Sequence, residues 1–180
     1  MSWSVNAVVG LPGSGKTLTM IFFMSVLDRK GIPFITNVLT DFENSIYIED
    51  DEVLKVFDIS KKHNVKVLFL DELWLWFDAR YSMSKTSREF TKYVLQIRKY
   101  GCHLYHTLQT WTQIDIRIRR LTTYIIVPEY INDEKTNVYI IDGVTETLVK
   151  RFSFRSKDYY KHYDTNQTYF KKLDQAVKDV

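Results

Sequence analysis

One short stretch limits the fold of this 180-residue chain more than any other: Gly-Leu-Pro-Gly-Ser-Gly-Lys-Thr, at residues 10–17. It matches the pattern Gly-x4-Gly-Lys-[Ser/Thr], in which glycines let backbone N–H groups turn towards phosphate oxygens. An apolar run at residues 5–9 precedes it and predicts a buried strand, and residues 16–30 predict a helix. A phosphate held here would also meet the positive end of the helix dipole. The context therefore favours a phosphate-binding P-loop over an ordinary strand–turn–helix corner.

The motif assigns roles to individual side chains. Lys16 is expected to reach the β- and γ-phosphates of ATP, and the Thr17 hydroxyl is expected to ligate Mg²⁺. ATP and Mg²⁺ are thus the predicted ligands. The residues predicted to contact the nucleotide are Gly10, Pro12, Gly13, Ser14, Gly15, Lys16, Thr17 and Leu18.

A second acidic site is expected at the end of another strand. Residues 65–70 are a strongly apolar run typical of a buried strand, and Asp71 and Glu72 follow it directly. Asp71 is predicted to hold Mg²⁺ through water, as P-loop sites require. Glu72 is placed to orient and deprotonate an attacking water, so it is the predicted catalytic base. Gln109 follows a predicted strand at 103–108 and is a candidate for sensing the γ-phosphate or positioning that water.

The remaining pattern predicts one α/β domain. Strands and helices alternate through the first two-thirds of the chain, which favours a mainly parallel sheet sandwiched by helices. Three later strands are expected to extend it antiparallel, the last two flanking a hairpin turn at Asp142-Gly143. Residues 1–180 are predicted to be a single domain, with a tail at about 156–180 packed on it or on a neighbouring subunit. The other predicted elements are strands at 33–39, 123–127, 137–141 and 148–154, a helix at 50–62, and a helix through residue 100 opened by a capping box at Thr86–Glu89.

Composition excludes several classes of protein. The chain is 45% hydrophobic and 26% charged, which is ordinary for a folded domain and excludes a disordered one. Its longest apolar run, residues 20–27, is too short to span a membrane, and residues 1–4 lack the features of a signal peptide. The single cysteine, Cys102, excludes an internal disulfide, and its spacing with the histidines predicts no metal other than Mg²⁺. We therefore expect a cytoplasmic protein without a transmembrane segment.

Charge is unevenly distributed along the chain. Residues 1–79 hold 7 basic and 11 acidic side chains, whereas residues 80–120 hold 9 basic and 2 acidic ones. Residues 121–180 hold 9 of each. The basic middle third is either a surface for phosphates or for an acidic neighbouring subunit, or simply a solvated helix face.

These residues together resemble the additional-strand P-loop ATPases of the FtsK/HerA superfamily. Within that superfamily they are most similar to viral genome-packaging ATPases and to the zonula occludens toxin-like assembly ATPases of filamentous phages. The resemblance spans roughly residues 5–165. The matching stretches are the P-loop at 10–17, Thr36-Asn37, Leu70-Asp71-Glu72, Arg98-Lys99-Tyr100-Gly101, the strand ending at Gln109, residues 114–119 followed by Thr122, and residues 159–165.

The resemblance implies a ring, commonly a hexamer, that hydrolyses ATP to translocate DNA. It also implies that an arginine of one subunit completes the ATP site of the next, where it neutralises charge as phosphate leaves. Arg119 fits the family pattern best. Toxin-like phage proteins usually carry a transmembrane segment after the ATPase domain, and its absence here favours a packaging motor. A capsid or membrane assembly protein is an implied further partner. The arginine candidates are Arg117, Arg119 and Arg120, with Arg98 and Arg88 behind them.

Contact with double-stranded DNA would have to come from the ATPase domain itself. Lys92 and Lys99 recur at helical spacing with Arg88, and Arg80 and Lys85 precede them, with Tyr81 and Tyr93 among them. Such a surface could follow a phosphate backbone without reading sequence.

Three other functions remain open at this point. A phage-type assembly or secretion ATPase would move a DNA–protein filament. A small-molecule kinase also begins with Gly-x-Pro-Gly-Ser-Gly-Lys, and residues 117–120 would then be a lid, although Glu72 and Gln109 argue against it. A nucleotide-gated binding protein with negligible turnover is the third.

Overall fold

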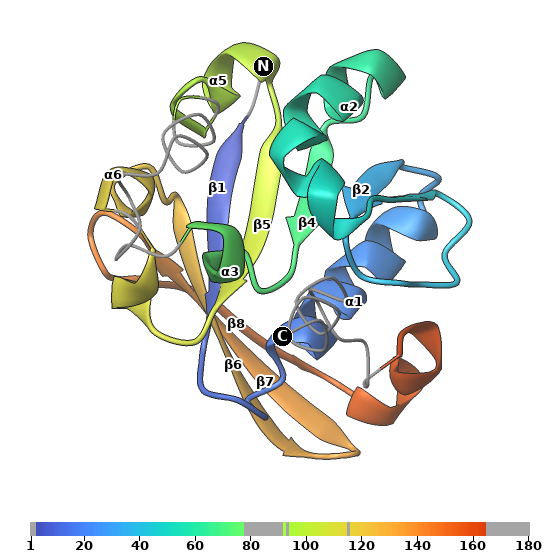
Figure 1. Ribbon diagram of the computed structural model, residues 1–180. Helices are drawn as coiled ribbons and strands as arrows, with labels where there is room; N and C mark the ends of the chain where they lie inside the picture. The colour runs from blue at the N-terminus through green and yellow to red at the C-terminus, as the bar shows by residue number, and fades with distance from the viewer. Residues whose placement is uncertain (1–2, 78–91, 93, 115, 165–180) are drawn as a thin grey trace, which may run out of the picture.

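The computed structural model describes residues 3–77, 92, 94–114 and 116–164, and it is built around an eight-stranded sheet (Figure 1). The strands lie in the order β3-β2-β4-β5-β1-β6-β7-β8. They are β1 Ser4–Val9, β2 Phe34–Thr36, β3 Ser45–Tyr47, β4 Val67–Leu70, β5 His103–Leu108, β6 Tyr124–Asn132, β7 Lys135–Asp142 and β8 Leu148–Phe154. The α-helices in the described ranges are α1 Lys16–Asp28, α2 Val56–His63, α3 Trp74–Phe77, α5 Ile97–Tyr100 and α6 Ile116–Arg119. Four 3₁₀ segments accompany them: η1 Asp50–Lys55, η3 Trp111–Gln113, η4 Ser156–Asp158 and η5 Tyr160–His162.

The strands from β3 to β6 run parallel. β1 lies between β5 and β6, so that Val8 is paired with Thr107 of β5 on one side and with Ile126 of β6 on the other. β7 and β8 then extend the sheet antiparallel. Because parallel strands all end at one edge, the residues after β1, β4 and β5 meet there, which is where α/β proteins bind ligands. The predicted fold class is confirmed.

Side chains of alternate strand residues enter two separate cores, as the period of two in a strand requires. On one face Leu68 and Leu70 pack with apolar residues of η1, α2, α5 and α6. On the other face Phe69 packs against α1, which is buried along much of its length. The sheet is therefore covered by helices on both sides, with α1 alone among the named α-helices on its face (Figure 1). In the described ranges, no helix combines the length and hydropathy that a bilayer crossing requires.

Several element boundaries differ from the predictions. The first helix ends at Asp28 instead of residue 30, because Gly31 adopts φ 65° and donates its N–H to Asp28 O at 2.8 Å. The helix predicted at 50–62 is a 3₁₀ segment followed by α2. β2 is shorter than predicted, since the chain leaves the sheet at Asn37. The capping box at Thr86–Glu89 lies outside the described residues, but Gly101 ends α5 in the left-handed region as predicted.

Two further features correct the sequence prediction. The strand predicted at 123–127 runs to Asn132 and is parallel to β1, so only β7 and β8 are antiparallel additions. β6 and β7 also form a hairpin, which was not predicted. The sequence indicated only the hairpin between β7 and β8. β3, α3 and α6 were also missed, because each has only three or four residues and shows no periodicity.

Candidate nucleotide-binding site

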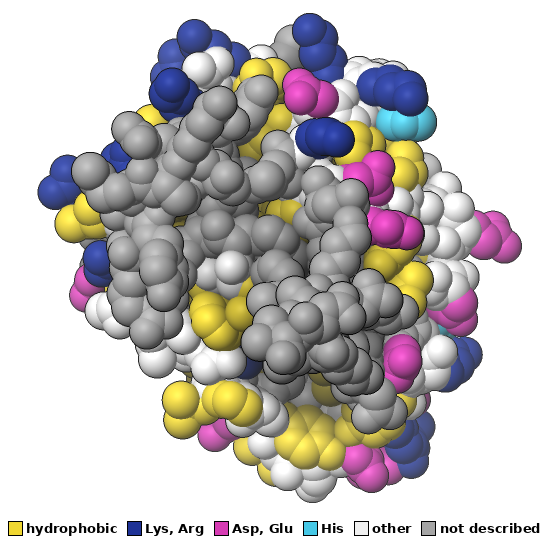
Figure 2. All heavy atoms as spheres, viewed as in Figure 1, with side chains coloured by type: hydrophobic (Ala, Val, Ile, Leu, Met, Phe, Trp, Pro, Cys, Tyr) yellow, Lys and Arg dark blue, Asp and Glu magenta, His cyan; other side chains and the backbone are white. Residues whose placement is uncertain are grey.

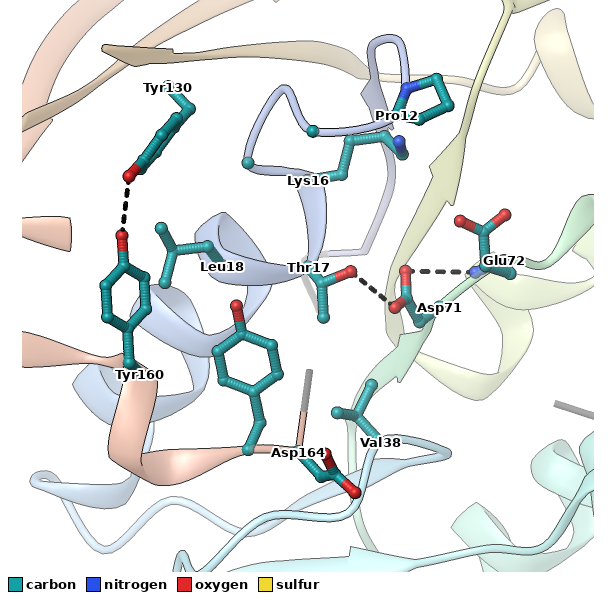
Figure 3. Close-up of a pocket in the computed structure, with 13 residues that line it drawn as sticks. Pro12, Lys16, Thr17, Leu18, Val38, Asp71, Glu72, Tyr130, Tyr160 and Asp164 are labelled. Atoms are coloured by element: carbon teal, nitrogen blue, oxygen red, sulfur yellow. Dashed lines mark hydrogen bonds between the residues drawn. The ribbon is translucent and has the colours of Figure 1, made fainter. Parts of the chain in front are cut away.

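A cavity of about 540 Å³ opens at the carboxyl edge of the parallel strands, beside the first turn of α1. Figure 3 shows its two ends: Asp71 and Glu72 lie at one side, and Tyr130 and Tyr160 lie at the other. Lys16 and Thr17 lie between these groups, and Leu18 lies beside Tyr160. The lining residues are Pro12, Gly13, Gly15, Lys16, Thr17, Leu18, Val38, Asp71, Glu72, Tyr130, Tyr160, Tyr163 and Asp164.

The loop between β1 and α1 has the backbone that its glycines predict. Gly13 and Gly15 have φ values of 79° and 90°, which side-chain-bearing L-residues rarely adopt. Gly10 is needed for a different reason, because a Cβ there would lie 2.4 Å from Ser14 Oγ. Lys16 is buried, and its Nζ donates to Leu11 O at 3.2 Å, so the ammonium is held within the loop. Six of the eight predicted nucleotide contacts line the cavity, whereas Gly10 and Ser14 shape the loop from behind it.

Asp71 is fixed by hydroxyl groups from two different elements. Thr17 Oγ1, on the first turn of α1, donates to Asp71 Oδ2 at 2.7 Å. Thr107 Oγ1, near the end of β5, donates to Asp71 Oδ1 at 2.6 Å. A hydroxyl and a carboxylate that leave other positions to phosphate and water match the oxygen ligands of Mg²⁺. These residues would therefore hold the metal, which would neutralise charge on the β- and γ-phosphates.

Two residues of this network were not given a role from the sequence. The Asn37 side chain donates to Asp71 O at 3.0 Å and accepts from Asp71 N at 2.8 Å. Thr107 also accepts the N–H of Glu72 at 2.7 Å. Both side chains are buried, and both lie at the carboxyl end of a strand. In the sequence, each is a polar residue at the end of an apolar strand. That pattern indicates a position at the edge of the sheet, but it does not show that the side chain contacts Asp71.

Glu72 lies beside Asp71 in a strained conformation. Its φ is 50°, in the left-handed region, where a non-glycine residue costs about 1–2 kcal/mol. Its carboxylate accepts a hydrogen bond from Nε1 of Trp74, the first residue of α3. Burial, with the nearby Asp71 charge as a second cause, raises the pKa of Glu72 above its ordinary value. A carboxylate with a raised pKa that faces the cavity is suited to accept a proton from water.

Three tyrosines and Asp164 form much of the remaining wall of the cavity. Tyr130 comes from β6, while Tyr160, Tyr163 and Asp164 come from the last described residues of the chain. The tail was predicted to pack on the domain or on a neighbour, and residues 156–164 pack on the domain itself. Their place in the cavity was not predicted, because the contacts join segments far apart in sequence.

The other predicted catalytic residues do not line this cavity. Gln109 is half-buried at the end of β5, and its N–H donates to Gln113 Oε1 at 3.0 Å. Arg117 and Arg119 lie on α6, which packs through Ile118 on the face of the sheet opposite α1. Arg119 is half-buried, and its Nε has no hydrogen-bond partner among the described residues. Neither Arg117 nor Arg119 lines the nucleotide cavity.

Figure 2 shows Lys and Arg side chains over α2 and along the lower right of the view, and others over α5 and α6. Lys92, Arg98 and Lys99 are exposed there, as are Arg117 and Arg120. The other side chains of the predicted DNA-binding surface, Arg80, Tyr81, Lys85, Arg88 and Tyr93, lie outside the described residues.

Comparisons with solved structures show the same fold in proteins of two kinds. The N-terminal domain of zonular occludens toxin from Neisseria meningitidis is 21% identical, with a TM-score of 0.68, over 91% of this chain and 100% of that one. The genome packaging NTPase B204 from Sulfolobus turreted icosahedral virus 2, in complex with ATP-gammaS, is 16% identical. Its TM-score is 0.61, over 82% of this chain and 96% of that one. B204, the DNA-packaging ATPase from Sulfolobus turreted icosahedral virus, is 14% identical with a TM-score of 0.61 over the same shares.

These are the two kinds of ATPase that the sequence resembles, so that relation is confirmed at the level of fold. No curated protein sequence gives a significant match to the chain. In a scan of protein families, residues 7–98 match the ATPase family associated with various cellular activities (AAA). The match covers 92 of 180 residues, including the P-loop and the Asp71-Glu72 corner. The chain therefore belongs to the AAA family and is a P-loop ATPase, an enzyme that binds and hydrolyses ATP.

Proposed function

We propose that this ATPase is a motor that translocates double-stranded DNA, most closely a viral genome-packaging ATPase. The observation that carries the proposal is the corner after β4, where Asp71 and Glu72 face a P-loop across one cavity. A motor must hydrolyse ATP without a phosphoryl acceptor, and a carboxylate beside the metal site can activate water for this purpose. The fold of the packaging NTPases, which this chain shares over most of their length, supports the same function.

The roles follow from position in the cavity. Lys16 would contact the phosphates of ATP, and Thr17 and Asp71 would hold Mg²⁺, which would neutralise charge on those phosphates. Glu72 accepts the proton of the attacking water. Gln109 does not line the cavity, but it directly follows β5, the strand that supplies Thr107, and we assign it to sensing the γ-phosphate or positioning the water. The basic surface over α5 and α6 follows the DNA backbone through charge alone, so affinity falls with salt.

The experiment measures ATP hydrolysis with and without double-stranded DNA, together with the oligomeric state. Glu72→Gln should bind ATP and fail to hydrolyse it. Glu146→Gln is the matched control. It makes the same chemical change at another glutamate in the left-handed region, φ 56°, which is exposed and lies outside the cavity. Stimulation of the wild type by DNA in a ring-sized species supports the motor. If the protein is a monomer and DNA does not change its rate of ATP hydrolysis, the motor is excluded.

Arg119 is the proposed arginine that acts in trans within a hexameric ring. Arg119 does not line the cavity of its own chain, and its Nε has no hydrogen-bond partner among the described residues, which supports this role. Arg119→Ala and Glu72→Gln subunits are each expected to be inactive alone. Mixed rings should regain hydrolysis at interfaces that join an intact Arg119 to an intact Glu72. Mixtures without recovery would place the arginine elsewhere, with Arg117 the next to test.

A phage-type assembly ATPase is the second candidate, supported by the fold shared with the zonular occludens toxin domain over all of that domain. Such a protein would hydrolyse ATP in response to a membrane or capsid assembly partner instead of naked DNA. Stimulation by membrane vesicles that carry the partner, without stimulation by DNA, would favour it over the packaging motor.

A further inference from the structure

The last described segment of the chain, residues 156–164, is anchored on both sides of the nucleotide cavity. We name it the C-terminal strap. At its start, Ser156 is buried and its hydroxyl lies 2.8 Å from Thr136 Oγ1 of β7. At its end, Tyr163 forms an isolated antiparallel bridge with Thr40, in the loop after β2. The strap thus passes over the carboxyl edge of the sheet, from the antiparallel hairpin to the parallel strands.

Side chains of the strap strengthen both anchors. His162 Nδ1 lies 2.7 Å from Asp41 Oδ1, and the His162 ring stacks on Phe42 with the centroids 4.8 Å apart. Tyr159 meets the rings of Phe22 and Phe154 edge-on, at 5.5 and 5.3 Å. These contacts hold the segment between them, which carries Tyr160, in one place against the cavity.

Tyr160 and Tyr130 form an aromatic wall in that place. Their phenol oxygens are 3.1 Å apart (Figure 3). Both hydroxyls also donate to Asp133 Oδ1, at 2.9 Å from Tyr160 and 2.8 Å from Tyr130. With the hydroxyl groups bound to a carboxylate in the β6–β7 turn, the two rings are oriented and their carbon surfaces remain for the cavity. Tyr130 keeps 38% of its surface exposed.

The cavity has a direction that matches a nucleoside triphosphate. The P-loop takes the phosphates, and Asp71 and Glu72 mark the end at which the γ-phosphate is attacked. Leu18 and the aromatic wall lie at the opposite side (Figure 3). A nucleotide bound with its terminal phosphate at Glu72 therefore carries its base towards Tyr130 and Tyr160. Stacking of a base on an aromatic side chain contributes about 1–3 kcal/mol.

We propose that the C-terminal strap supplies the base-binding half of the ATP site, with the nucleobase stacked on Tyr160 against Tyr130 and Leu18. The inference rests on the nucleotide site of the proposed function, and it does not depend on movement of DNA. The strap lies outside the region that matches the AAA family, residues 7–98, so neither the P-loop nor that match assigns it this role.

Calorimetric titration with ATP and with inorganic tripolyphosphate, both with Mg²⁺, separates the two halves of the site. Tyr160→Leu is expected to weaken ATP binding about 10-fold and to leave tripolyphosphate binding within about twofold of wild type. Tyr160→Phe keeps the ring and should stay near wild type. Tyr139→Leu is the control, because Tyr139 is a tyrosine of β7 that does not line the cavity. Equal losses for both ligands, or no loss for either, would overturn the proposal.

A second measurement follows the base itself, and its main arm uses the wild-type protein alone. The triphosphate of 2-aminopurine riboside is fluorescent, and stacking on an aromatic ring quenches it. Binding to the wild-type protein should quench this fluorescence, and Tyr160→Leu should restore it. A bound analogue whose fluorescence is unchanged would refute base stacking. Because neither experiment contains DNA, these results stay separate from the test of translocation.

Discussion

Replacement of Thr107 by valine tests whether the buried hydroxyl of β5 supports the metal site. Thr107 is fully buried, and its hydroxyl both donates to Asp71 Oδ1 at 2.6 Å and accepts from Glu72 N at 2.7 Å. Valine keeps the shape and removes both hydrogen bonds. A hydrogen bond to a charged group contributes about 1.5–3 kcal/mol, and Glu72 N retains only a 3.2 Å contact with Asp71 Oδ1. We expect Thr107→Val to lower the free energy of unfolding by about 2–3 kcal/mol, or Tm by roughly 5–10 °C.

The same change should slow ATP hydrolysis. When Mg²⁺ takes the hydroxyl of Thr17, Thr107 becomes the remaining hydroxyl that orients Asp71 among the described residues. Loss of such a supporting group typically reduces metal affinity or activity about 10- to 100-fold. Thermal unfolding, and steady-state hydrolysis against Mg²⁺ concentration, measure the two effects.

Thr107→Ser separates the hydroxyl from the packing. Serine keeps both hydrogen bonds and removes one buried methyl group, which costs about 1 kcal/mol. It should therefore lose some stability and keep its Mg²⁺ dependence. The assigned support of Asp71 is wrong if Thr107→Val hydrolyses ATP as fast as wild type. It is also wrong if Thr107→Ser hydrolyses ATP as slowly as Thr107→Val.

Three further substitutions test backbone and charge. Because burial raises the pKa of Glu72, wild type loses stability as pH rises from the ordinary glutamate pKa to the raised one. Glu72→Gln should therefore gain stability relative to wild type over that interval. Unfolding midpoints of the two proteins are measured against pH, with Glu146→Gln as the control. A difference between wild type and Glu72→Gln that stays constant with pH would contradict the prediction. Gly15→Ala forces a side-chain-bearing residue to φ 90°, so ATP should bind at least about 10-fold more weakly by calorimetry. Gly31→Ala is the control: it places a side chain at another left-handed glycine, φ 65°, so it should destabilise the fold as Gly15→Ala does but keep the affinity for ATP. Burial lowers the pKa of His106 from 6.5 to about 3, so the neutral ring stabilises the fold above pH 6.5 and this contribution is lost as pH falls towards 3. Relative to His106→Leu, wild type should lose about 3 kcal/mol by pH 4 in denaturant titrations, and parallel curves for the two proteins would exclude this.

The Asp71-Glu72 corner shows a local conflict at a functional position. Glycine or asparagine would occupy φ 50° at lower cost than glutamate does at Glu72. The surrounding structure holds the corner through Thr107, which accepts the Glu72 N–H, and through Trp74, which binds its carboxylate. Strain of this kind persists where neighbouring contacts over-determine the backbone. The glutamate is retained where a carboxylate is needed.

Much of the fold and part of the site could be predicted because the relevant signals are local. The P-loop requires glycines at fixed offsets, and the strand before Asp71 is an unbroken apolar run. His103–Leu108 and Leu148–Phe154 were predicted with the bounds that the structure has, since both are flanked by turn residues. Strands as short as β3 carry too few residues for a period to be detected.

The sequence by itself predicted the chemistry of the phosphate half: a loop to bind phosphate, Thr17 and Asp71 for Mg²⁺, and a carboxylate to activate water. These depend on residue types at fixed spacings, which any fold with a strand before the loop and a helix after it must respect. Only the tertiary structure decided which residues complete the site. Thr107 meets Asp71 because β4 and β5 are neighbours, and Tyr160 meets Tyr130 because the strap returns over the sheet. Such contacts join residues far apart along the chain, and no local pattern encodes them.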